Sequence, residues 1–389
     1  MTPTSSSSLR ALFLLWLGGN GLRLTILAVP PILALIIPDL GLSGTQVGIL
    51  NAIPVSLFAL VAVPGSLLIA RVGAFNALVV GLLIAAGGSA ARGFAVDAHT
   101  LFAATVLMAA GVAVMQPALP PLVRQWLPHR IGFATAVYTN GLLCGEIFPV
   151  VLAALVVPLL GGGWRPSLEL WSIVSAVIAV VIFVMRPQGG DGAAAHTRRW
   201  MPDWRDPLLW KVGLVAAANN QLYFCTNAFL PGLLLQNGHT DLIRPALSAL
   251  NAGQLPGSLF LLVAASHLER KKWPFIFCGV FGLLSILGVA TATNLWIVVC
   301  AAGFIGFAAA VSLTLVLTLP ALLVAPDDVP RMSAGVFTIG YGTAMVVSLI
   351  GGVLWDATGS AAFAFLPIAV AILPMVLVPP LIDLRTQRS

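Results

Sequence analysis

Long apolar runs, separated by short polar or Pro- and Gly-containing breaks, fill almost the whole chain. A helix that crosses the hydrocarbon core of a bilayer needs about 20 mostly apolar residues. By that length the pattern predicts twelve spanning helices, at residues 11–37, 45–69, 74–94, 100–124, 131–159, 167–185, 207–235, 243–266, 273–291, 294–323, 331–355 and 361–382. Spans 3, 6, 9 and 12 are uniformly apolar, whereas others carry polar residues, Gly and Pro near their centres. Lipid cannot pair polar side chains, so we expect these centres to face the interior of a bundle.

The longest polar segment lies at 187–206 and divides six spans from six. Its Gly, Ala and charged residues are typical of a linker. We therefore predict an N-terminal six-helix bundle at 1–186, a cytoplasmic linker at 187–206 and a C-terminal six-helix bundle at 207–389. The predicted fold class is an all-α membrane protein with twelve transmembrane helices in two pseudo-symmetric bundles.

A weak internal repeat relates the two halves through a shift of 199 residues. The shift aligns Asn20 with Asn219, Pro121 with Pro320, Gly141 with Gly340, and Val137-Tyr138-Thr139 with Val336-Phe337-Thr338. Two six-helix repeats with a site near the membrane midplane are typical of many secondary transporters.

Composition excludes several classes of protein. The 389 residues are 59% hydrophobic and only 8% charged, whereas a soluble chain carries about 25% charged residues. The net charge of +6 does not indicate nucleic-acid binding, because the basic residues lie in short loops and form no aromatic-lined patch. The four cysteines lie in apolar runs without a CxxC pair and indicate neither disulfides nor a metal site.

No catalytic or nucleotide-binding motif such as HExxH, Walker A or GxSxG occurs, so we expect no enzyme activity and no cofactor. The energy for transport would then come from an ion or substrate gradient across the membrane. The first apolar run contains Arg23 and lacks a small-residue cleavage site, so we interpret it as a retained span and not as a signal peptide.

Lys and Arg are distributed unevenly between the two sides of the predicted spans. With the N-terminus inside, only Arg92, Arg165 and Arg244 lie outside, and Arg23 lies within the membrane. The cytoplasmic side holds Arg10, Arg71, Arg124, Arg130, Arg186, Arg198, Arg199, Arg205, Lys211, Arg270, Lys271, Lys272, Arg331, Arg385 and Arg388. The positive-inside rule therefore predicts a bacterial inner-membrane protein with both termini in the cytoplasm.

Three stretches carry a family resemblance: Asn20-Gly-Leu-Arg23 followed by Pro30-Pro31, GILNAIPVSLFALVAVPGSLLIARVGAFNALVVGL at 48–82, and QPALPPLVRQWLPHRIG from Gln116 leading into ATAVYTNG. The chain resembles the major facilitator superfamily, and more narrowly its cyanate permease and nitroimidazole transporter branch. The resemblance implies a cavity lined by spans 1, 2, 4, 5, 7, 8, 10 and 11. The loop at 70–74 departs from the family's acidic and basic motif because it lacks Asp, which leaves the usual cytoplasmic gate contacts unassigned.

Arg23 lies about twelve residues into span 1, roughly 18 Å deep at the rise of a helix. A charge at this depth costs at least about 2.5–3.5 kcal/mol and needs a partner. A guanidinium suits a planar or linear anion, so Arg23 is a candidate substrate contact. The alternative is structural pairing with backbone carbonyls or with Glu146.

Glu146 is the only acidic residue deep in a span, and its predicted depth differs from that of Arg23 by only a few ångströms. It could be a proton-coupling or gating residue, or half of a permanent ion pair. Five other polar residues in inner spans are candidate substrate contacts, with interhelical hydrogen bonding as the alternative: Asn20, Gln116, Tyr138, Asn220 and Tyr341.

These observations favour secondary active transport of a small anion, cyanate-like or another small monovalent ion, by alternating access and with proton coupling. The alternative is an exporter of small heteroaromatic or apolar compounds. The expected partners are a small-molecule substrate and the lipid bilayer, with no nucleic acid, and the expected state is a monomer.

Overall fold

The computed structural model describes residues 5–187, 200–291 and 295–384. Residues 188–199 of the predicted linker, and Arg385 and Arg388, lie outside the described residues. Ten helices in the described part are long and apolar enough to cross a membrane. One of these, α4, contains two spans joined at a kink, and span 7 is divided between α9 and α10. The structure thus has the twelve spans that the sequence predicts.

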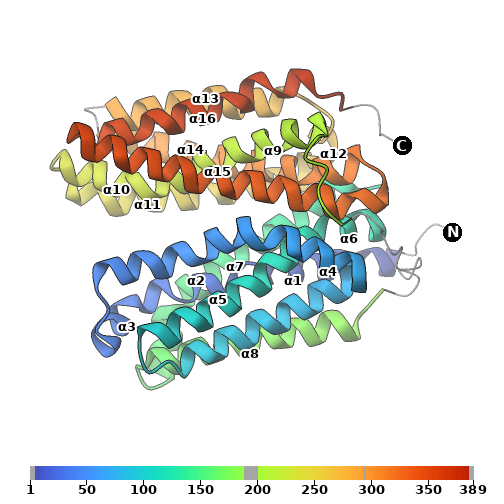
Figure 1. The fold of residues 1–389 in the computed structure, drawn as a ribbon, viewed down its shortest axis with the longest axis horizontal. Coiled ribbons are helices and arrows are strands. Elements are labelled where there is room, and N and C mark those ends of the chain that lie inside the picture. Colours follow the sequence, from blue (N-terminus) through green and yellow to red (C-terminus); the bar gives the residue numbers. More distant parts are fainter. Residues whose placement is uncertain (1–4, 188–199, 292–294, 385–389) are drawn as a thin grey trace. The chain divides into compact units, whose positions relative to one another are not determined.

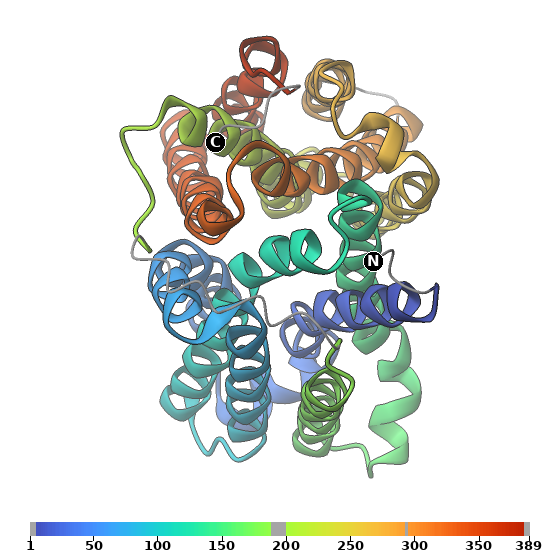
Figure 2. The same ribbon diagram turned by 90° about the vertical axis from the view of Figure 1, so that its right-hand side faces the viewer.

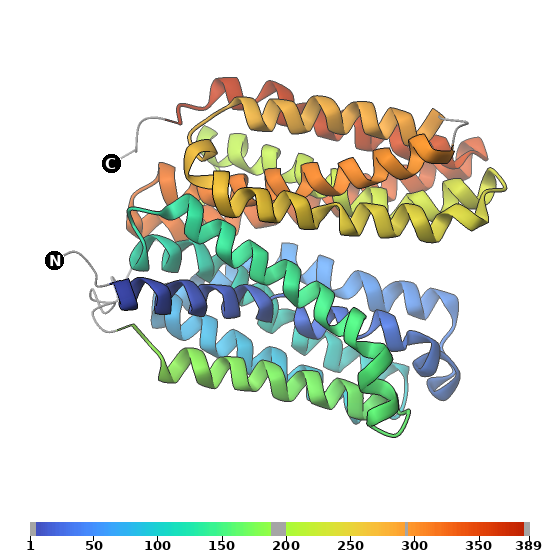
Figure 3. The same cartoon turned by 180° about the vertical axis from the view of Figure 1, so that it is seen from behind.

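Two compact units make up the chain. Unit 1 comprises Met1–Pro202 and Pro326–Ala334, and unit 2 comprises Asp203–Ala325 and Gly335–Ser389. The helices of unit 1 are α1 (Ser5–Gly21), α2 (Leu24–Leu27), η1 (Pro30–Ile32), α3 (Leu33–Leu40), α4 (Gly44–Gly93), α5 (Ala98–Met115), η2 (Gln116–Ala118), α6 (Leu119–Trp126), α7 (Ile131–Leu159) and α8 (Trp164–Val184). Within this unit α4 packs on α5 and α8, and α1 packs on α7 (Figures 1 and 3).

Unit 2 repeats the plan of six spans. Its helices are α9 (Pro207–Asn220), η3 (Gln221–Cys225), α10 (Thr226–Gln236), η4 (Thr240–Leu242), α11 (Ile243–Ala252), α12 (Gln254–Leu268), α13 (Trp273–Thr291), α14 (Leu295–Leu323), α15 (Val329–Thr358, from Gly335 on), η6 (Ala361–Ala364), α16 (Phe365–Leu377) and η7 (Pro379–Leu381). Residues 329–334 of α15, and η5 (Pro326–Asp328) before them, belong to unit 1. In unit 2, α14 packs on α11, α12 and α13, and α16 packs on α9 and α13. Figure 2 shows the helices of each unit from their ends.

Side-chain caps define several helix starts. Ser43 Oγ accepts a hydrogen bond from Gln46 N at the start of α4, and Gln46 Oε1 accepts one from Ser43 N. Asp97 Oδ1 accepts a 2.8 Å hydrogen bond from Thr100 N at the start of α5, which holds the pKa of Asp97 below its usual value. Each cap pairs a backbone N–H that the first helical turn leaves without a partner.

Spans 2 and 3 need no separate loop, in contrast to the predicted break at 70–74. The helix assignment runs through α4, and only Gly73 departs from helical geometry, with φ 82° and ψ 160°. Glycine adopts this left-handed conformation without the clash of a Cβ atom. A single residue therefore reverses the chain between two spans.

Span 1 is also not one continuous helix. It breaks between α1 and α2 at Leu22 and Arg23, and it continues through η1 into α3. Span 7 has an irregular turn at the repeat-related place, because a shift of 199 residues aligns Leu22 with Gln221, where the π-helical turn η3 begins. Such π-turns occur frequently at functional sites. Both breaks lie next to the polar residues that the sequence analysis selected.

Candidate functional site

The break in span 1 sets the position of Arg23. The amide of Arg23 donates to Asn20 O at 3.2 Å, and that of Leu22 donates to Gly19 O at 3.1 Å. These i to i−3 bonds tighten the end of α1, and Arg23 itself has φ −124° and ψ −25° as the N-cap of α2. Backbone without regular helical hydrogen bonding is tolerated at membrane depth only inside protein or beside a cavity. Arg23 therefore lies at the interruption of the helix, inside unit 1.

Small residues bring α1 and α7 into direct backbone contact. A Cβ atom at Gly19 would collide with the carbonyl oxygen of Tyr138, and a Cβ at Gly145 would collide with that of Asn20. Glycines at helix interfaces in membranes allow this close approach. The indole of Trp16 adds a 3.1 Å hydrogen bond to Asn140 Oδ1 across the same interface.

Glu146 follows Gly145 directly and meets Arg23 across this interface. The Nε atom of Arg23 lies 3.2 Å from Glu146 Oε1, and the two side chains are 7% and 15% exposed. The ring of Phe58, on α4, lies beneath the guanidinium at 5.3 Å from its central carbon. The charge of Arg23 is thus met by one carboxylate and one aromatic face, each from a different helix.

Arg92, which the sequence analysis counted on the outer side, lies at the end of span 3 with its side chain turned into the protein. Its side chain is 1% exposed in the last turn of α4. Its Nη2 atom donates hydrogen bonds to Thr25 O at 2.6 Å and to Ser89 Oγ at 3.0 Å. The guanidinium reaches the carbonyl oxygen of a residue in α2, whose four-residue length leaves its backbone acceptors with few partners. Arg92 therefore ties the segment that follows Arg23 to span 3.

The other candidate substrate contacts of unit 1, Asn20, Gln116 and Tyr138, are all buried, and Asn20 is close to the break in span 1. Asn20 lies one turn before Arg23, and Gln116 begins the 3-10 turn η2 in span 4. The neighbouring Met115 has its Cε atom 3.5 Å from where a Cβ of Gly21 would lie. Tyr138 is 2% exposed on α7, two turns before Glu146. Span 4 and span 5 thus both contribute buried polar residues, and span 4 packs against the interrupted helix.

In unit 2 Asn220 packs against Gly340, the residue that precedes Tyr341 on α15. The amide nitrogen of Asn220 lies 3.0 Å from where a Cβ of Gly340 would be. Tyr341 follows Gly340 on α15, stacks on Phe337 with ring centroids 6.2 Å apart and contacts Phe224 at 5.9 Å. Phe224 in turn meets Tyr223 at 5.1 Å. The π-turn η3 therefore presents two of the rings in a row of four aromatic side chains.

Other polar residues of span 7 form hydrogen bonds between helices. Tyr223 Oη donates to Asn251 Oδ1 at 2.8 Å, and Asn251 Nδ2 donates to Asn227 Oδ1 at 3.3 Å. Ser312 Oγ donates to Asn219 Oδ1 at 2.7 Å. Interhelical bonding, the alternative that the sequence left open, accounts for these residues.

Two residues that contribute to the arrangement at Arg23 were not selected from the sequence. Phe58 is one apolar residue among many in span 2, and the sequence gives no signal that its ring faces a charge. Arg92 was counted from the sequence only as a basic residue near the outer end of a span, and that count gives no information about its burial. A buried guanidinium whose ion pair can open offers an anion site, and its carboxylate offers a proton site.

A model of the family described as "Major Facilitator Superfamily" matches residues 13–268. Among curated proteins, the chain is 28% identical to the 2-nitroimidazole transporter of Escherichia coli (strain K12) over 252 residues, which is 64% of this chain and 61% of the relative. It is 25% identical to the cyanate transport protein CynX of the same organism over 363 residues, covering 90% of this chain and 91% of the relative. The sequence-based resemblance to this branch is thereby confirmed.

Among solved structures, the human organic anion transporter MFSD10 (TETRAN) has the same fold. The TM-score is 0.78 at 14% identity, over 95% of this chain and 99% of the other. The family and the relatives found are transporters, which bears out the prediction that the chain is not an enzyme. With twelve helical spans in two six-helix bundles and a family match over more than half of its length, the chain belongs to the Major Facilitator Superfamily.

Proposed function

We propose that this chain is a secondary active transporter of a small monovalent anion, coupled to protons and working by alternating access. The observation that carries the proposal is the position of Arg23: a charge at a break inside span 1, paired with the carboxylate of Glu146. Burying a guanidinium at the depth of the bilayer core costs free energy. Binding of an anionic substrate to Arg23 during the transport cycle would explain why the charge is kept there.

The ion pair also suggests how anion and proton are coupled. In the structure, Arg23 and Glu146 neutralise each other at 3.2 Å. An anion that takes over the guanidinium leaves the carboxylate of Glu146 buried without its counter-charge, which is unfavourable. Uptake of one proton by Glu146 restores neutrality, so that one anion and one proton cross together. After the anion leaves Arg23 and the proton leaves Glu146, the two side chains form their ion pair again.

The remaining candidate residues would contact the anion through neutral hydrogen bonds. Asn20, Gln116 and Tyr138 are the proposed contacts in unit 1, and Asn220 and Tyr341 are those in unit 2; each is buried and on a predicted inner span. A single guanidinium with neutral donors suits a compact monovalent ion better than a di- or tricarboxylate. The name of the cyanate transport relative is in keeping with this class of substrate.

Cell location, orientation and domain limits belong to the same proposal. We place the protein as a monomer in the bacterial inner membrane with both termini in the cytoplasm. The support is the distribution of Lys and Arg, with fifteen predicted on the cytoplasmic side and three on the outer side. The proposed domains are an N-terminal bundle at 1–186, a cytoplasmic linker at 187–206 and a C-terminal bundle at 207–389.

A second candidate function has its own observation. The aromatic row of Tyr223, Phe224, Phe337 and Tyr341 in unit 2 could stack on a planar ring, and one relative is named a 2-nitroimidazole transporter. Export of small heteroaromatic compounds is therefore the alternative. It predicts transport that does not depend on Arg23.

A binding screen on the purified protein tests the proposal. Cyanate, nitrate, nitrite, formate and 2-nitroimidazole would be titrated separately while the thermal unfolding temperature is measured, because a ligand that binds the folded state raises it. A rise with one or more of the anions, lost in Arg23→Ala, supports anion transport. A rise with 2-nitroimidazole alone, kept in Arg23→Ala, would support the alternative.

A further inference from the structure

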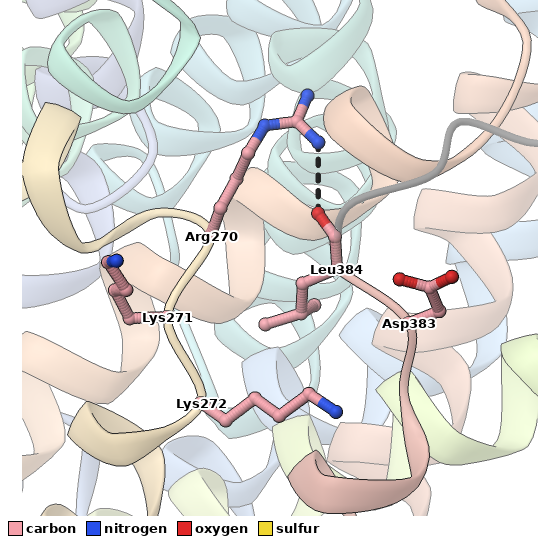
Figure 4. Close-up of a pocket in the computed structure, with 5 residues that line it drawn as sticks. All are labelled: Arg270, Lys271, Lys272, Asp383 and Leu384. Carbon is pink, nitrogen blue, oxygen red and sulfur yellow. Dashed lines mark hydrogen bonds between the residues drawn. The ribbon is translucent and has the colours of Figure 1, made fainter.

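A cluster of positive charge lies at one end of unit 2, away from the candidate substrate residues. Arg270, Lys271 and Lys272 follow one another in the loop between α12 and α13. With Asp383 and Leu384 they line a hollow of about 370 Å³ (Figure 4). No residue proposed above to contact the substrate lines this hollow.

The basic side chains hold the end of span 12 through its carbonyl oxygens. Arg270 Nη1 donates to Leu384 O at 2.9 Å, and Lys272 Nζ donates to Pro380 O at 2.8 Å. Lys211, on α9, donates to Leu381 O at 2.9 Å. Carbonyl dipoles at a helix C-terminus attract cations but do not neutralise a full charge. The lining of the hollow contains three cations, Arg270, Lys271 and Lys272, and the carboxylate of Asp383, so it carries an excess of positive charge.

The internal repeat shows that the fold does not need all of this charge. A shift of 199 residues aligns Arg71 with Arg270, Val72 with Lys271, and Gly73 with Lys272. The corresponding turn of unit 1 is made with one basic residue and a glycine at φ 82°. The two lysines have no basic counterpart in unit 1, and the ammonium group of Lys271 has no hydrogen-bond partner within the described residues, where only its backbone N–H is paired, with Leu268 O. Their charge is available for a ligand.

Exposed tryptophans mark the level of this cluster in the membrane. Trp273, which follows Lys272, is 55% exposed, and Trp210, which precedes Lys211, is 45% exposed. Trp204 packs on Trp210 with ring centroids 6.3 Å apart. Tryptophan is enriched where the apolar core of the bilayer meets the headgroups. The lysines beside these rings thus lie at the depth of lipid phosphates.

We propose that Lys271 and Lys272, with Arg270 beside them, bind the phosphate of an anionic phospholipid headgroup. Ammonium and guanidinium groups near an anionic surface attract such headgroups, and the tryptophans contact the adjoining acyl chains. Asp383, on the opposite wall of the hollow (Figure 4), selects against binding that brings more than one negative charge deep into it. The site is independent of the transport cycle proposed for Arg23.

The test uses the purified full chain in detergent and measures unfolding temperature against added lipid. The probes are phosphatidylglycerol, phosphatidylcholine and inorganic phosphate. We expect phosphatidylglycerol to stabilise the protein at lower concentration than phosphatidylcholine, and Lys271→Gln/Lys272→Gln to weaken its binding by roughly 30-fold. The matched control Arg71→Gln, at the repeat-related loop, keeps the binding of the unaltered protein.

The single variant Lys271→Gln guards against a folding defect, because Lys271 holds no carbonyl of span 12; a loss of about fivefold or more is expected. Equal binding of phosphatidylglycerol and phosphatidylcholine would overturn the proposal, as would unchanged binding in both lysine variants. Inorganic phosphate that displaces the lipid at a similar concentration would overturn it too, because the site would then belong to a soluble anion.

Discussion

Gly145 of α7 lies directly against the backbone of Asn20 in α1, so closely that a Cβ atom on Gly145 would collide with the Asn20 carbonyl oxygen. The next residue along α7 is Glu146, and Arg23 lies one turn beyond Asn20. The contact between the two backbones therefore sets the 3.2 Å separation of Arg23 Nε and Glu146 Oε1.

Gly145→Ala should consequently destabilise the protein by about 1–3 kcal/mol, the usual cost of overpacking a tight interface. Gly87→Ala is the matched control, because a Cβ there would have no neighbour within 4 Å, and it should be neutral or slightly stabilising, by up to about 1 kcal/mol. Thermal unfolding of both purified variants checks this. Equal unfolding temperatures for the two variants would show that α1 and α7 do not need this contact.

Hydropathy and residue depth predicted much of this arrangement. The span limits of α7 match at 131–159, and similar depths for Arg23 and Glu146 left their pairing open as one alternative. Two features of the backbone were not predicted: the break at Leu22 and Arg23, and the π-turn at Gln221. Each changes only which backbone groups are hydrogen-bonded to each other. Hydropathy depends on the side chains alone, so it gives no sign of such a change.

The burial of Arg92 was not predicted for a related reason. Counting basic residues on each side of the membrane gives no information about burial, whereas the side chain of Arg92 turns inward to the carbonyl oxygen of Thr25. That acceptor exists only because α2 is short and interrupted. Sequence alone could not show it, since the break had to be known first.

Arg23 variants test the anion contact. Arg23→Lys keeps the charge but loses the planar fork of the guanidinium, so substrate binding should weaken about tenfold to a hundredfold, the worth of a charge-assisted hydrogen bond. Arg23→Ala should abolish binding in a protein that still inserts. Titration calorimetry with the anion found in the screen measures both. Arg244→Lys, an exposed residue, is the control; affinity as high in Arg23→Lys as in this control would refute the ligand role.

Topology is tested with reporters. The uneven distribution of Lys and Arg predicts that a reporter fused after Ser389 and another inserted within 189–197 are both cytoplasmic. Alkaline phosphatase and green fluorescent protein fusions, which are active on opposite sides, give the readout. Periplasmic activity at either place would contradict the proposed orientation.

Charge balance predicts the electrical behaviour of transport. If one anion and one proton cross together, uptake into liposomes should respond to a pH gradient and should be insensitive to a potassium–valinomycin membrane potential. Radiolabelled anion uptake under each gradient separates the two drives. Uptake that follows the membrane potential instead would mean that the proton and the anion do not cross in equal numbers.

Glu146→Gln tests the proposed coupling most directly. The amide imitates the protonated carboxyl, so the variant should still exchange substrate across liposomes but should lose accumulation driven by a pH gradient. A purely structural ion pair behaves differently: removing one partner of a buried pair costs about 3–5 kcal/mol, which would lower the unfolding temperature and impair exchange and accumulation alike.

The decisive measurement is exchange and gradient-driven accumulation in the same proteoliposomes, with unfolding temperature recorded for each protein. The unaltered protein is compared with Glu146→Gln and with the control Glu169→Gln, which changes a half-buried carboxyl on α8 that is not among the candidate site residues. The account predicts that Glu146→Gln alone keeps exchange and loses accumulation. Accumulation that persists in Glu146→Gln would contradict it, because Glu146 could not then be the essential proton carrier.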